Sequence, residues 1–72
     1  MEKFTFGLTD LTSFDQPAGE GWLDAKGAAR RSRLLARRLR RSMSEAMLSG
    51  LCVVAFDGEG RPSSIIPLAT VH

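Results

Sequence analysis

The most prominent chemical feature of the chain is a run of arginines. Seven arginines fall within 12 residues, between Arg30 and Arg41, and no acidic residue lies among them. A guanidinium group offers a planar fork of N–H donors that pairs bidentately with phosphate or carboxylate, and it is less strongly hydrated than an ammonium group. The chemistry that this segment could perform is therefore the binding of a fixed anionic surface.

Residues that could carry catalysis are few. His72, the only histidine, is the last residue, where nothing in the sequence holds an imidazole in place. Cys52 lies in an apolar run, which predicts a buried thiol with a raised pKa and little nucleophilicity. A single histidine and a single cysteine are also too few for a structural zinc site or an internal disulfide. We therefore expect no enzyme activity, no cofactor and no metal.

Two Gly-Glu-Gly sequences look like fragments of phosphate-binding loops. The first, at 19–21, reaches Asp24 where a dinucleotide-binding fingerprint has glycine. The second, at 58–60, continues into Arg61 and a proline instead of opening a helix. Both sequences are predicted to be turns.

A helix over about residues 24–49 is expected to position the arginines. At about 100° per residue, its apolar side chains gather into one stripe and the arginines occupy the opposite side. Asp24 is the expected N-cap, and Gly50 is the expected left-handed residue that ends the helix. The stripe predicted to face the core consists of Ala25, Ala28, Ala29, Ser32, Leu35, Ala36, Leu39, Met43, Ala46 and Met47.

The segments on either side of this helix have the patterns of strands. Residues 3–8 alternate apolar and polar, which predicts a half-buried strand. Residues 51–56 are a continuous run of strand-forming apolar residues, followed by a turn and a returning strand that completes a hairpin over about 51–68. Two prolines place that returning strand at a sheet edge. Residues 9–21 are predicted to be a loop.

The expected fold is α+β, a single small domain over residues 1–72 in the order β-α-β-β. One amphipathic, Arg-rich helix packs on a small three-stranded sheet, and it can cover only one face of that sheet. The other face requires a cover, because the strand at 51–56 is apolar on both sides. A second copy is the simplest cover, so we expect a homodimer. The segment 9–21, folded over that face, is the alternative.

Charge is divided unevenly along the chain, although its net value is only +2. Residues 1–24 have a net charge of −4, residues 25–49 of +7 and residues 50–72 of −1. The composition, 43% hydrophobic and 25% charged, is that of a globular protein. No stretch is long and apolar enough to span a membrane, and the N-terminus does not resemble a secretory signal, so a cytoplasmic protein is expected. GC-rich coding bias could also enrich arginine.

Two leucines on the arginine side of the helix favour a protein partner over a nucleic acid. Leu34 and Leu48 flank Arg41 on the helical projection, and aliphatic groups among arginines favour a protein interface. The sequence therefore indicates a small intracellular regulatory binding protein, an adaptor or inhibitor of the type encoded by phages and operons, that docks on an acidic macromolecular partner. The alternative is a nucleic-acid-binding protein that uses the same face on the phosphate backbone. The candidate partner-binding residues are Arg30, Arg33, Leu34, Arg37, Arg38, Arg40, Arg41 and Leu48.

Overall fold

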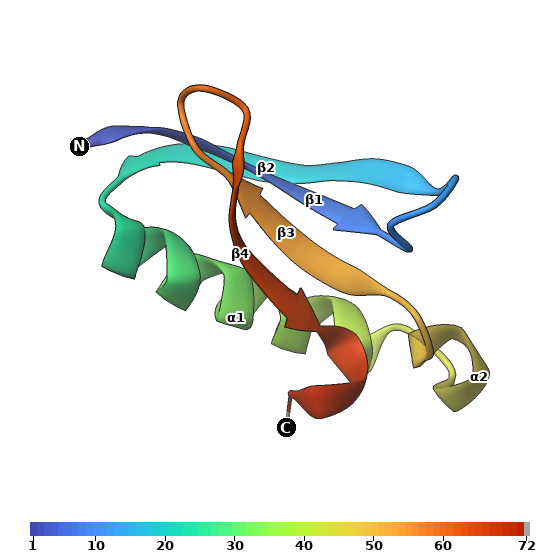
Figure 1. Ribbon diagram of the computed structural model, residues 1–72. Helices are drawn as coiled ribbons and strands as arrows, with labels where there is room; N and C mark the ends of the chain where they lie inside the picture. Colours follow the sequence, from blue (N-terminus) through green and yellow to red (C-terminus); the bar gives the residue numbers. More distant parts are fainter. Residues whose placement is uncertain (72) are drawn as a thin grey trace.

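The computed structural model describes residues 1–71, which form an α+β structure with one main helix on an antiparallel sheet (Figure 1). The sheet has the order β2-β1-β3-β4, and every neighbouring pair of strands is antiparallel. The main helix, α1, lies across one face of this sheet. In chain order the elements are β1 (Glu2–Thr9), β2 (Asp15–Leu23), α1 (Ala25–Arg41), α2 (Glu45–Leu48), β3 (Cys52–Phe56), β4 (Pro62–Pro67) and the 3-10 turn η1 (Leu68–Thr70).

The sheet has four strands, so the prediction of three strands and of a loop over residues 9–21 was wrong. Strand β2 pairs with β1 from Asp15 opposite Thr9 to Leu23 opposite Glu2. The Gly-Glu-Gly sequence at 19–21 accordingly lies within a strand and not in a turn. Pairing with β2 satisfies backbone N–H and C=O groups that β1 would otherwise expose along its edge.

The core lies between α1 and the sheet, and the alternation in β1 determines which side chains enter it. Phe4, Phe6 and Leu8 are buried, as the period-two pattern predicts. The next strand in the sheet, β3, adds Val53 and Ala55 to the same side. Burial of these large side chains is the main stabilising term for so small a protein.

The helix is shorter than the sequence predicts. It ends at Arg41, the chain turns through residues 42–44, and only then does the short helix α2 begin. This turn places Leu48 in the core, 4% exposed, and leaves Met47 57% exposed, which reverses the predicted environments of both residues. Ala25 and Ala46 are also exposed, not buried in the predicted stripe. Gly50 has the expected left-handed backbone, with φ of 83°, but it follows α2 and not one long helix.

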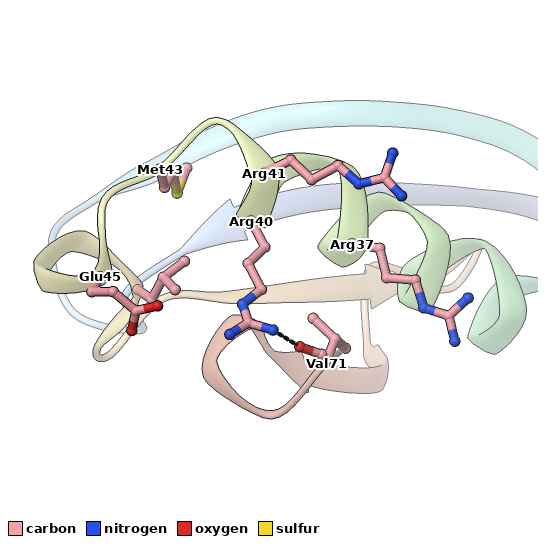
Figure 2. A pocket seen from close by; sticks show the side chains of 7 residues that line it. Arg37, Arg40, Arg41, Met43, Glu45 and Val71 are labelled. Carbon is pink, nitrogen blue, oxygen red and sulfur yellow. Dashed lines mark hydrogen bonds between the residues drawn. The ribbon is translucent and has the colours of Figure 1, made fainter.

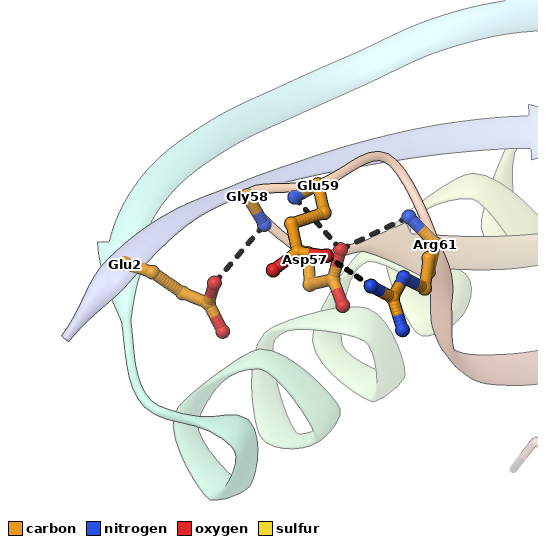
Figure 3. Close-up of polar contacts among 5 residues, drawn as sticks. All are labelled: Glu2, Asp57, Gly58, Glu59 and Arg61. Atoms are coloured by element: carbon orange, nitrogen blue, oxygen red, sulfur yellow. Dashed lines mark hydrogen bonds and ion pairs between the residues drawn. The ribbon is translucent and has the colours of Figure 1, made fainter.

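The predicted hairpin is confirmed as β3 and β4, with β4 at a sheet edge. Its turn is held by Asp57, whose carboxylate accepts hydrogen bonds from the backbone N–H groups of Glu59 and Arg61, both at 2.9 Å. Glu2 of β1 accepts a further bond from the N–H of Gly58 at 3.2 Å, so this turn is tied to the start of the chain (Figure 3).

Candidate functional site

Helix α1 begins at a well-defined cap. Asp24 has an extended backbone, and its carboxylate accepts a hydrogen bond from the N–H of Gly27 at 2.7 Å, as predicted for an N-cap. The last turn carries Arg38, Arg40 and Arg41, which lie favourably at the negative end of the helix dipole. Charged residues of opposite sign therefore stabilise the two ends of α1.

Small residues on the inner side of α1 fix which side chains point outward. Ala28, Ser32 and Ala36 are buried against the sheet. The hydroxyl of Ser32 donates to the carbonyl oxygen of Ala28 at 2.9 Å, and it lies 3.2 Å from the hydroxyl oxygen of Ser64 in β4. This contact fixes how α1 is rotated about its own axis relative to the sheet. Residues on the opposite side of α1 therefore face solvent.

The outward side of α1 is what we call the basic face. Its members are all exposed, and they lie at spacings of three and four residues, which brings successive side chains next to each other. Leu34 is the single aliphatic member and is 43% exposed. The basic face consists of Arg30, Arg31, Arg33, Leu34, Arg37, Arg38 and Arg41.

None of the arginines of the basic face is neutralised by a carboxylate in residues 1–71. The ion pairs found there are Lys3 with Glu20, at 3.2 Å, and Arg61 with Glu59, and both lie outside α1. An unpaired guanidinium group keeps its full set of N–H donors for a ligand. The electrostatic potential of the basic face is thus available to a partner.

Four of the five acidic residues of the first 24 positions, Glu2, Asp10, Glu20 and Asp24, are engaged in local structure. The Asp10 carboxylate accepts hydrogen bonds from the backbone N–H groups of Thr12, Ser13 and Phe14, at 2.9 to 3.0 Å. These bonds, with that of Thr12 the largest influence, lower the pKa of Asp10 to about 2. Glu20 is paired with Lys3 on the sheet. The negative charge of this segment is therefore held in the β1–β2 hairpin and in the cap of α1, and not on the outward side of the helix.

Arg40 differs from the other arginines in its contacts. It is half-buried, and its guanidinium group donates to the carbonyl oxygen of Val71 (Figure 2). The Arg37 and Arg41 side chains extend away from Glu45, whereas Arg40 reaches across to the C-terminal segment. Arg40 was predicted to bind a partner, but its donor is used to attach residue 71 to α1.

Leu48 was also predicted to bind a partner from an exposed position on the helix, but the structure buries its side chain. Its side chain joins the core cluster that contains Leu8, Val53 and Leu68. The pair of leucines that favoured a protein interface is thereby reduced to Leu34. Arg31 was not among the predicted partner-binding residues, and the structure leaves it exposed beside them.

A shallow hollow lies beside the basic face, between the end of β2 and α1. Its volume is about 490 Å³, and Leu23, Gly27 and Leu34 supply its apolar part. Arg30, Arg31, Arg33 and Arg37 line the rest of this hollow. Four arginines of the basic face therefore line one shallow hollow together with apolar side chains.

Residues 1–71 were also searched for a reactive cysteine, a metal site and a membrane-spanning helix. Cys52 is buried, and burial raises the pKa of its thiol, as expected for a structural cysteine. No group of three or more His, Cys, Asp or Glu side chains is placed to hold a metal ion within this range. Nor does any helix there combine the length and the apolar character needed to cross a membrane. The expectation that His72 has no catalytic role lies outside the described residues.

In comparisons with known proteins, the chain matches no family model, no curated protein and no solved structure.

Proposed function

We propose that the protein is a small regulatory binding module that docks the basic face of α1 on the phosphate backbone of a nucleic acid. One observation carries the proposal: the exposed arginines lie on a single rigid helix, and no carboxylate in the described chain is within 4.0 Å of them. Contacts between arginine and phosphate release condensed counterions, so several of them give measurable affinity without any contact to a base.

The dimensions of α1 suit a groove of double-stranded DNA. From Arg30 to Arg41 the helix rises about 16 Å, a distance over which a duplex presents several phosphates on each strand. An α-helix fits the major groove, which is about 12 Å wide. Arg33 and Arg38 point about 140° apart around the helix axis, so they would reach phosphates on opposite walls of the groove. Arg37 and Arg41 would face its floor.

An acidic protein surface is the second candidate, and the exposure of Leu34 favours it. Leu34 lies between Arg30 and Arg37 on the outward side, where an aliphatic group adds little to phosphate binding but packs well in a protein interface. The burial of Leu48 removes the other leucine on which this interpretation depended. We therefore place the nucleic acid first.

The test is a titration of a fluorescently labelled random-sequence duplex, followed by anisotropy at several salt concentrations. We expect micromolar affinity at about 50 mM salt and a steep loss of affinity as salt rises. The double variant Arg30→Gln/Arg37→Gln should reduce the slope of log Kd against log salt by about two, because each phosphate contact contributes about 0.9.

Arg61→Gln is the matched control, because Arg61 is exposed but lies in the β3–β4 turn and pairs with Glu59. It should leave the slope unchanged. Absence of binding to duplex DNA and to heparin at about 50 mM salt would remove the nucleic-acid proposal, since non-specific attraction is strongest at low ionic strength. In that case, binding to an acidic protein that depends on Leu34 becomes the remaining candidate.

A further inference from the structure

Leu34 is the one member of the basic face that cannot bind a phosphate group. Its side chain is 43% exposed and carries neither a charge nor a hydrogen-bond donor. The other members of the basic face are arginines, which pair with phosphate oxygens. A single exposed leucine is common on protein surfaces, so its position among the arginines decides what it can contact.

Leu34 lies between the arginines that would line the two walls of a DNA groove. At about 100° per residue, it is about 100° from Arg33 and about 40° from Arg38, inside the arc of about 140° that separates those two side chains. Helix α1 forms an outer layer of the molecule, with the sheet on its inner side (Figure 1). When Arg33 and Arg38 bind phosphates on the walls of the major groove, Leu34 therefore faces the edges of the bases on its floor.

The surroundings of Leu34 are apolar on one side. The shallow hollow beside the basic face has Leu23, Gly27 and Leu34 as its apolar lining. Gly27 has no side chain, and a Cβ atom at this position would lie 3.0 Å from Oδ1 of Asp24 and 3.4 Å from Cδ2 of Leu23. The packing of the helix cap thus favours glycine at position 27, which leaves the hollow open next to Leu34.

We propose that Leu34 recognises thymine in the major groove, by packing against the C5-methyl group that thymine presents there. Among the four bases, thymine is the one with an apolar group on its major-groove edge. The inference rests on the proposed function, since it requires α1 to lie in the major groove of a duplex. The arginines on the walls then supply affinity that is independent of sequence, and Leu34 supplies a preference for sites with thymine on the floor.

The same contact disfavours the other bases. Guanine presents two acceptors in the major groove, cytosine presents an amino group, and adenine presents one acceptor and one amino group. A leucine packed against these polar atoms would displace water without replacing its hydrogen bonds, which is unfavourable. Covering a methyl group removes apolar surface from water instead, and each methyl group that is fully covered should raise affinity by a factor of about three to four.

The experiment compares two short labelled duplexes that differ only in this methyl group. The first duplex alternates adenine and thymine, and the second has uracil at every thymine position, which keeps the phosphates and the base pairing but lacks the C5-methyl group. Binding is followed by fluorescence anisotropy at about 50 mM salt and above. The protein should bind the thymine duplex about three- to fourfold more tightly, with the same slope of log Kd against log salt for both, because the phosphate contacts are the same.

One variant and one matched control on the same helix assign the preference to Leu34. Leu34→Ala keeps a good helix former but shortens the side chain, so it should bind both duplexes with equal affinity and leave the salt slope unchanged. Arg33→Gln should weaken binding to both duplexes by the same factor and lower the slope by about one, while the preference for thymine remains. Both positions are exposed, so both variants should fold, which circular dichroism verifies.

Two results would overturn the thymine contact and leave the proposed function intact. The first is equal binding of the two duplexes by the unaltered protein. The second is a preference for thymine that persists in Leu34→Ala, which would assign it to another residue or to the shape of the duplex. Absence of binding to either duplex would instead contradict the proposed function, and this inference with it, so the two failures are distinguishable.

Discussion

Leu48 and Met47 are neighbours in sequence with opposite environments, so they test where α1 ends. Leu48→Ala removes most of a side chain that belongs to the core cluster with Leu8, Val53 and Leu68. The lost transfer free energy and the cavity left behind should together cost about 2 to 5 kcal/mol. At roughly 0.05 to 0.15 kcal/mol per residue, the whole chain unfolds with only about 4 to 11 kcal/mol. This one substitution should therefore remove a large share of the stability.

Met47→Ala is the matched control, since it truncates a side chain that is mostly in solvent. Its effect should stay within about 0.5 kcal/mol. Thermal unfolding followed by circular dichroism measures both variants, and Leu48→Ala should lower Tm by about 10 °C or more, because 1 kcal/mol corresponds to about 4 to 8 °C in a domain of this size. If Met47→Ala were as costly as Leu48→Ala, one helix would continue past Arg41 and the packing of Leu48 described above would be wrong.

Three further substitutions or reactions test local features. Asp10 has a pKa lowered to about 2 from an ordinary value of 3.8, so its contribution to stability is present above the ordinary value and is lost as pH falls toward 2; Asp10→Asn should flatten the fall in Tm between about pH 4 and pH 2. Cys52 should react with iodoacetamide slowly in the folded protein and rapidly in urea, since its thiol is buried and its pKa raised; equal rates would contradict this burial. Arg40→Ala should lower Tm more than Arg37→Ala does, because Arg40 alone of the two donates to Val71; the reverse order would show that this contact contributes little.

The elements that were predicted correctly are those whose side chains carry a strong period. Phe4, Phe6 and Leu8 alternate cleanly in β1, and the apolar run of β3 is bounded by glycine and by a turn. In both strands the sequence pattern and the buried contacts agree, so local and tertiary preferences lead to the same structure. Asp24 was recognisable as a cap for the same reason, because its carboxylate acts on a backbone only three residues away.

Strand β2 could not be predicted because its own sequence disfavours a strand. It contains Pro17, Gly19 and Gly21, and its register with β1 shifts between Phe6 and Gly7, which breaks any alternation. Its position at a sheet edge leaves most of its side chains in solvent, so little hydrophobic signal remains. The free edge of β1, which is a tertiary feature, determines that this segment becomes a strand.

The sequence predicted that the arginines lie together on one helix, but it did not predict which neighbouring residues belong to the exposed face. Arg30 to Arg41 lie on one helix as expected, because Ala and Leu at helical spacing leave little alternative. Leu48 was misplaced because residues 42–48 are compatible with continued helix, whereas in the structure the chain turns at Ser42 and Leu48 is buried in the core. Arg40 was misplaced because its contact with Val71 joins positions 31 residues apart, which helical spacing does not reveal.

Chemical-shift mapping tests the proposed nucleic-acid interface most directly. A short duplex is titrated into ¹⁵N-labelled protein, and the backbone amides, the arginine Nε–H signals and the Trp22 indole N–H are followed together. We expect the largest changes at Arg30, Arg33 and Arg37, and little change at the Trp22 indole, since this side chain lies on the opposite side of the sheet from α1. Changes concentrated at Trp22 and Ile65, with the arginines of α1 unaffected, would contradict the assignment of the basic face as the binding surface.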